Sequence, residues 1–150
     1  MKKVNTILIV IIYMFAILMI SIFGLEADIF KENIPVEEVI CLNESDDRTE
    51  VSELTDKKLI KIEFTTSGDL ADPNSTMLFL NCKVLPDNAS NKRLRYSYDT
   101  DKFKDAVTMV LDEQGNARGV FLFHKRVVFD MKITATDGSE KSTTVKIKIY

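Results

Sequence analysis

The chain has 150 residues, 45% of them hydrophobic and 29% charged, and its formal net charge is −3 at pH 7. Because acidic residues outnumber basic ones, the basic stripe that binds DNA or RNA is absent, and nucleic acid is not an expected partner. The length is enough for one globular domain with its own core, in addition to a short N-terminal segment.

The first feature along the chain is an uncharged run over residues 4–25, which follows Lys2 and Lys3 and ends before Glu26. As a helix, the part between Ile7 and Leu25 is roughly 28 Å long, close to the thickness of the hydrocarbon core of a bilayer. We therefore expect residues 1–25 to form a signal-anchor, a transmembrane helix that contacts lipid between Ile7 and Leu25. The two lysines favour an N-terminus in the cytoplasm, which places the rest of this single-pass protein outside the cell membrane.

A cleaved signal peptide is the alternative interpretation of the same run, and cleavage makes the protein secreted. Against cleavage, the apolar stretch is longer than the core of about 7–15 residues that signal peptides have. The small-x-small cleavage pattern is also poor, since Leu25-Glu26-Ala27 has a bulky residue at its outer position.

Residues 26–56 are polar and mainly acidic, apart from an apolar island over residues 36–42. Without Lys2 and Lys3, the chain after the anchor has 18 basic and 23 acidic residues, a formal charge of −5. Two interpretations fit this leader: a stalk that holds a domain off the membrane, or an irregular segment whose island packs on the domain as an extra element.

The only two cysteines are Cys41, in this leader, and Cys82, in a predicted strand. In an exported protein they can form a disulfide that ties the leader to that strand. Alternatively, Cys82 lies on the inward face of its strand as a free cysteine, where it behaves as a small hydrophobe.

From Lys57 onward the hydrophobic pattern has a period of two, which predicts strands. Turn-forming residues separate the segments, for example over 66–74, 86–88, 112–116 and 137–139. The predicted strands cover residues 58–64, 76–85, 93–98, 106–111, 117–123, 127–135 and 143–149. About seven strands with one apolar face each predict an all-β domain over residues 57–150, an antiparallel β-sandwich. Lys146 and Lys148 point outward from the last strand, which is typical of a sheet edge.

Residues 84–99 read VLPDNASNKRLRYSYD. This stretch resembles the bacterial immunoglobulin-like domain, group 2, which has a Pro-x-Asn-Ala-Thr/Ser-Asn-Lys turn before a Val/Leu-x-Trp strand. The turn at residues 112–115 and the final hairpin around residues 137–139 fit the same family. Tyr96 stands where the family has tryptophan, and residues 119–126 lack its small-residue segment. The resemblance covers residues 57–150, and it implies an immunoglobulin-like sandwich that serves as a surface module in adhesins or cell-wall-associated proteins.

No residue pattern predicts catalysis, a cofactor or a metal site. His124 is the only histidine, and no oriented nucleophile accompanies it in the sequence. One histidine and two cysteines do not make a zinc site, and the dense Asp and Asn pattern of a calcium site is missing. Where their side chains face solvent, Phe121, Phe123 and His124 are the predicted contact surface.

These observations predict a membrane-tethered, extracytoplasmic immunoglobulin-like module at the cell surface. It is expected to act by binding or spacing, as adhesion modules do, without catalysis, and to contact an unknown protein or a cell-wall glycan. A secreted binding or inhibitor protein and an envelope enzyme are the two alternatives.

Overall fold

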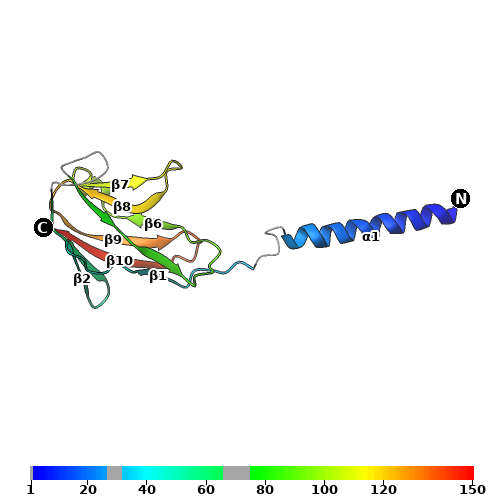
Figure 1. Ribbon diagram of the computed structural model, residues 1–150, viewed down its shortest axis with the longest axis horizontal. Coiled ribbons are helices and arrows are strands. Elements are labelled where there is room, and N and C mark those ends of the chain that lie inside the picture. The colour runs from blue at the N-terminus through cyan, green and yellow to red at the C-terminus, as the bar shows by residue number, and fades with distance from the viewer. Residues whose placement is uncertain (1, 27–31, 66–74) are drawn as a thin grey trace. The chain divides into compact units, whose positions relative to one another are not determined.

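The computed structural model describes residues 2–26, 32–65 and 75–150, and the chain divides into two compact units, Met1–Asn33 and Ile34–Tyr150. The first unit contains the helix α1 (Lys2–Glu26). The second is built mainly of strands, which confirms the all-β prediction (Figure 1). The predicted turn over residues 66–74 and residues 27–31 of the leader lie outside the described residues. The elements of the second unit are β1 (Glu38–Cys41), β2 (Thr49–Glu53), β3 (Lys58–Ile62), β4 (Thr76–Phe79), β5 (Cys82–Leu85), β6 (Leu94–Ser97), α2 (Thr100–Phe103), β7 (Val107–Leu111), β8 (Ala117–Phe123), β9 (Val128–Ala135) and β10 (Ser142–Ile149).

The helix α1 is apolar around its circumference. Its described large hydrophobic side chains, between Ile9 and Ile20, are 38–68% exposed. Within the described residues, no helix is both long enough and apolar enough to cross a membrane. Membrane spanning by residues 1–25 stays a prediction.

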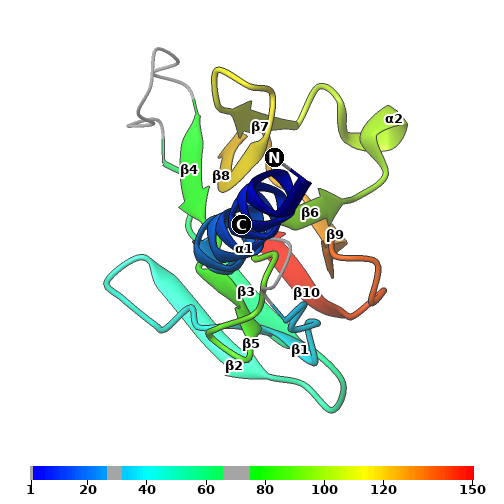
Figure 2. The same cartoon turned by 90° about the vertical axis from the view of Figure 1, so that its right-hand side faces the viewer.

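The strands of the second unit form three hydrogen-bonded sheets (Figures 1 and 2). The largest has the order β2-β3-β10-β9-β6, the second has the order β4-β8-β7, and β1 pairs with β5. All pairs are antiparallel except β3 with β10, which run parallel, so the prediction of a wholly antiparallel structure is wrong at this pair. The prediction that the last strand is a sheet edge is also wrong, because β3 and β9 cover both sides of β10.

One core joins the five-stranded sheet to the three-stranded sheet. Met131 of β9 and Ile147 of β10 are completely buried, and so is Phe121 of β8 on the facing sheet. The rings of Phe123 and Phe129 lie 6.1 Å apart between their centroids, across the two sheets. Each such side chain contributes roughly 1.5–3 kcal/mol when buried, so this shared core is what holds the sheets face to face.

The compact unit begins at Ile34 rather than at Lys57, which corrects the predicted domain boundary. The apolar island supplies Val36, Val39 and Cys41 to the core, where each is at most 6% exposed. From Ile34 onward the leader is therefore an element packed on the domain and not a stalk. The packed element is the second of the two interpretations that the sequence left open.

The predicted strand over residues 76–85 is two strands with different partners. β4 pairs with β8, whereas β5 pairs with β1. Leu80 and Asn81 separate them, and the carbonyl of Leu80 accepts a hydrogen bond from the Cys82 N–H at 3.1 Å. Among the described residues, this change of partner leaves one edge of β4 without a neighbouring strand, and it positions the candidate site.

Candidate functional site

The open edge of β4 presents main-chain groups to solvent. The Leu80 N–H donates to the Gly119 carbonyl at 2.7 Å, so the main-chain groups of residues 76, 78 and 80 face β8. Those of Met77 and Phe79 consequently point away from β8. Among the described residues, the Met77 N–H and C=O and the Phe79 N–H have no hydrogen-bond partner. Unpaired main-chain groups along a sheet edge are a template with which another extended chain can pair.

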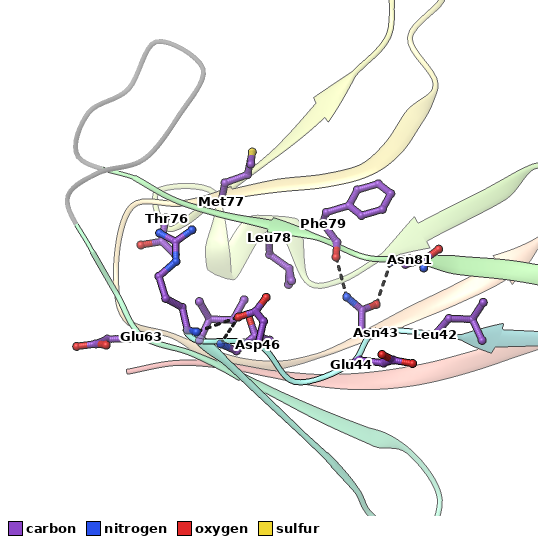
Figure 3. Close-up of a pocket in the computed structure, with 13 residues that line it drawn as sticks. Leu42, Asn43, Glu44, Asp46, Glu63, Thr76, Met77, Leu78, Phe79 and Asn81 are labelled. Atoms are coloured by element: carbon purple, nitrogen blue, oxygen red, sulfur yellow. Dashed lines mark hydrogen bonds between the residues drawn. The ribbon is translucent and has the colours of Figure 1, made fainter.

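Asn43 closes one end of this edge. Its side-chain amide donates to the Phe79 carbonyl at 2.8 Å and accepts from the Asn81 N–H at 2.9 Å. The amide therefore makes the two bonds that a residue of a neighbouring strand would make, as Figure 3 shows. The free part of the edge begins at the Phe79 N–H and runs toward Thr76.

A groove of about 630 Å³ lies along this edge. One wall is β4, and the other is formed by residues 42–49 and the end of β3. The charged side chains that line it are Glu44, Asp46, Arg48 and Glu63, so the groove is net acidic. An extended segment that carries a basic residue matches this charge.

Asp46 helps to shape the acidic wall. Its carboxylate accepts hydrogen bonds from the N–H groups of Arg48 at 2.9 Å and Thr49 at 2.7 Å. The bond from the Arg48 N–H is the main cause that lowers the pKa of Asp46 below its ordinary value of 3.8. Asp46 is therefore ionised at neutral pH and fixes the turn that leads into β2.

The outer face of β4 adds apolar surface beside the groove. Met77 is 43% exposed and Phe79 is 54% exposed. Figure 3 shows their side chains on the face opposite to that of Leu78, which points into the core. A strand added at this edge would therefore place alternate side chains next to Met77 and Phe79, and the others beside Leu78.

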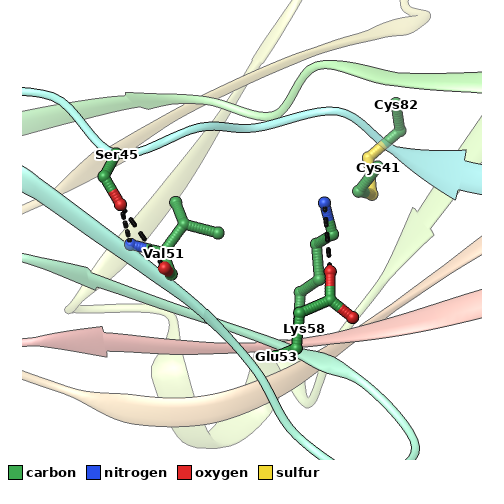
Figure 4. Close-up of polar contacts among 6 residues, drawn as sticks. All are labelled: Cys41, Ser45, Val51, Glu53, Lys58 and Cys82. Atoms are coloured by element: carbon green, nitrogen blue, oxygen red, sulfur yellow. Dashed lines mark hydrogen bonds and ion pairs between the residues drawn. A yellow bond between two sulfur atoms is a disulfide. The ribbon is translucent and has the colours of Figure 1, made fainter.

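Cys41 and Cys82 form a disulfide at the end of the β1–β5 ladder, where they are directly opposite each other. Their Cα atoms are 4.0 Å apart and their sulfurs are bonded (Figure 4). Immediately after it, the Leu42 N–H donates to the Asn81 carbonyl at 2.7 Å, and then the chain leaves β5. The disulfide thus fixes the point at which pairing stops and the open edge starts.

Ser45 ties the segment that follows Cys41 to β2 of the five-stranded sheet. Its hydroxyl accepts from the Val51 N–H at 2.9 Å and donates to the Val51 carbonyl at 3.4 Å, on β2 (Figure 4). On the same hairpin, Lys58 forms an ion pair with Glu53 at 3.7 Å. Asn43, which bonds to β4, and Ser45, which bonds to β2, therefore hold the groove wall to both sheets.

The predicted contact surface at Phe121 and Phe123 is wrong, because both side chains are completely buried. In the β4–β8 register, Phe121 is opposite Leu78 and Phe123 is opposite Thr76, on the face that points into the core. The ring of Phe121 meets that of Tyr96 edge to face, at 5.5 Å between centroids. Both residues serve packing.

His124, the third predicted contact residue, is half-buried directly after β8. Its Nε2 lies 2.9 Å from the Thr108 hydroxyl, and its N–H donates to the Ala106 carbonyl at 2.9 Å. These contacts hold the end of β8 against the start of β7. No cluster of three or more His, Cys, Asp or Glu residues that could hold a metal ion occurs in the described parts of the chain.

No protein-family model matches this chain, and no curated protein matches it.

The residues of the open edge were missed by sequence analysis. Met77 and Phe79 read as the outward positions of an ordinary strand, and Asn43 as part of an acidic leader. The one signal in the sequence is that the outward residues of this strand are large and apolar instead of polar. That signal is visible only once the strand is known to be a sheet edge.

Proposed function

We propose that this protein is a membrane-tethered, extracytoplasmic immunoglobulin-like module that acts by binding and carries out no catalysis. The order of the strands is the observation that carries the proposal. Immunoglobulin-like domains place strands A, B, E and D in one sheet and C, F and G in the other. The first order corresponds to β1-β5 together with β4-β8-β7, two hydrogen-bonded sheets in which β5 and β4 stand for one bent strand. The second corresponds to β6-β9-β10, with β3 and β2 as additional strands beyond β10. The sequence resemblance over residues 57–150 supports the same assignment.

Three observations support a membrane tether and a position outside the cytoplasm. The Cys41–Cys82 disulfide is of the kind that persists in oxidising compartments. The exposed apolar side chains of α1 are unfavourable in water, and lipid is the environment that suits an uncharged run between Ile7 and Leu25. Lys2 and Lys3 favour an N-terminus in the cytoplasm.

Cell fractionation with protease treatment tests the tether. We expect the full-length protein in the membrane fraction, with the second unit degraded when protease is added outside intact cells. A full-length protein in the cytosol would overturn the proposal. A shorter product in the medium that lacks residues 1–25 would replace the tether with secretion.

The binding partner in this proposal is an extended segment of another protein, added to β4. Strand addition uses the main-chain donors and acceptors of an exposed edge for affinity and pockets beside it for specificity. The free groups of Met77 and Phe79 and the acidic groove beside them support this mode. A segment with alternating apolar residues and a basic residue has the matching chemistry.

A proline at position 77 tests strand addition at the level of the main chain. Met77→Pro removes an N–H that points away from β8, and proline is tolerated on edge strands. Met77→Ala is the matched control, because it keeps the N–H and removes only the side chain. Both variants carry a photo-crosslinking amino acid at position 79. We expect cells with Met77→Ala to give a product crosslinked to the partner, and cells with Met77→Pro to give none. Equal products from both variants, or no product from either, would refute strand addition at β4.

A further inference from the structure

A second cleft lies on the opposite edge of the fold, between β6 and the hairpin that joins β7 to β8. Its volume is about 820 Å³. The edge strand β6 forms one wall with Leu94 and Tyr96, and Leu111 and Ala117 of the hairpin lie on the other. The residues of the proposed β4 groove do not contribute to this cleft, so it is a separate site.

The cleft is basic although the protein is acidic. Four of its lining residues are cations: Lys92, Arg93, Arg95 and Arg118. None of the four has an ion-pair partner within the described parts of the chain, whereas five lysines elsewhere do. These exposed cations are therefore accessible to an anionic ligand.

Asp112, the only acidic residue among the described residues that line the cleft, is already engaged. Its carboxylate accepts hydrogen bonds from the N–H groups of Asn116 at 2.8 Å and Gln114 at 3.0 Å. The bond from Asn116 is the main cause that lowers the pKa of Asp112 below its ordinary value. Asp112 therefore holds the β7–β8 turn, and its single negative charge, which interacts with Arg118, leaves the four-cation lining of the cleft net positive.

The main chain of β6 adds a second kind of complementarity. In the part of the chain that the structure describes, β6 pairs with β9 only, and the Thr136 N–H donates to the Arg93 carbonyl at 3.1 Å. In this register the main-chain groups of residues 93, 95 and 97 face β9, and those of Leu94 and Tyr96 face the cleft. Among the described residues, the N–H and C=O groups of Leu94 and Tyr96 have no partner.

We propose that this cleft binds an extended acidic peptide segment, which adds to β6 as a strand and places its carboxylates beside Arg95 and Arg118. A peptide offers alternating donors and acceptors that match the N–H and C=O groups of Leu94 and Tyr96. A polyphosphate offers only acceptors to this edge, so it supplies no donor to the carbonyl groups of Leu94 and Tyr96. Guanidinium groups bind carboxylates through two parallel hydrogen bonds, so the arginines select the charge.

Fluorescence anisotropy with the full-length protein in detergent micelles tests this inference. The probe is a labelled peptide that alternates Glu with Val and Thr, and the comparison peptide has Gln in place of each Glu. We expect the Gln peptide to bind at least about tenfold more weakly, the size of one lost charged hydrogen bond. The Glu peptide with methylated alternate amides cannot donate to the edge, so it should not bind.

Paired variants locate the site. Arg95→Gln with Arg118→Gln should weaken binding of the Glu peptide about tenfold or more. The control, Lys125→Gln with Arg126→Gln, removes the same charge from exposed residues outside the cleft and should leave the affinity unchanged. Because all four side chains are exposed, both variants should keep the circular dichroism of the wild type.

Three results would overturn the inference. The first is equal loss of affinity in the cleft and control variants, which would indicate a general charge effect. The second is binding of the amide-methylated peptide. The third is displacement of the Glu peptide by polyphosphate beyond the effect of equal ionic strength, which would indicate a site for anionic polymers.

Discussion

The disulfide between Cys41 and Cys82 should contribute a large part of the stability of the second unit. It closes a loop with a sequence separation of 41 residues. The loss of chain entropy in the unfolded state for a loop of this length corresponds to about 4 kcal/mol at room temperature. A domain with a free energy of unfolding of about 5–15 kcal/mol would therefore lose a substantial fraction of it.

Urea unfolding, followed by far-ultraviolet circular dichroism, measures this contribution in Cys41→Ala, Cys82→Ala and the double variant. Either substitution breaks the bond, so all three should lose the same free energy of unfolding, about 4 kcal/mol. The wild type in a reductant is the matched control and should unfold at the urea concentration of the variants. Single losses that add up in the double variant, or losses below about 1 kcal/mol, would refute the loop-closure argument.

Three further predictions concern the core and the loops. Gly119→Ala should lower the free energy of unfolding by about 1–3 kcal/mol, since Gly119 has a φ of +74° and a Cβ there would lie 2.8 Å from the Leu80 carbonyl oxygen. Gly115→Ala, with a φ of +80° and nothing within 4 Å, is the control for backbone strain and should cost less in the same urea titration. Phe121→Ala should cost about 3–5 kcal/mol and Phe79→Ala less than about 1 kcal/mol, and equal costs would contradict the burial of Phe121. Hydrogen bonds from the Ser139 hydroxyl and the Val36 N–H lower the pKa of Asp137 below 3.8, so its stabilising contribution is present above that pH and is lost as the pH falls through the lowered pKa. The difference in melting temperature between the wild type and Asp137→Asn should therefore shrink in acid, and a gap that does not change with pH would contradict this.

Alternation of apolar residues predicted most of the strands, because one face of each is buried. In β10, Val145, Ile147 and Ile149 are buried and repeat every second residue. Alternation did not decide the structure where the burial signal was short. The strand β1 covers only Glu38–Cys41 within an acidic stretch, and the helix α2 has no buried residue at all.

The candidate site could not be predicted because strand order is a tertiary property. Lys146 and Lys148 have the composition of an edge, yet β10 lies in the interior of its sheet. Phe121, Leu122 and Phe123 are all buried, although alternation would leave one face of β8 exposed. Leu122 is on the outer face of β8, where Met77 of β4 and Thr108 of β7 are directly opposite it. Alternation alone assigns a face to each side chain, and it does not say whether that face or edge is covered.

The open edge of β4 nevertheless has an explanation in the sequence. Val39 and Cys41 face the core from β1, so a longer β1 would place Asn43, Ser45 and Asp47 at the next inward positions. Burying a charged carboxylate and two polar side chains between the sheets costs several kcal/mol without partners. The chain therefore leaves β5 directly after the disulfide, and Asn43 and Ser45 bond to the main chains of β4 and β2 instead. The same polar residues that end β1 thus leave the edge of β4 free, and the proposed binding groove follows from where the apolar island stops.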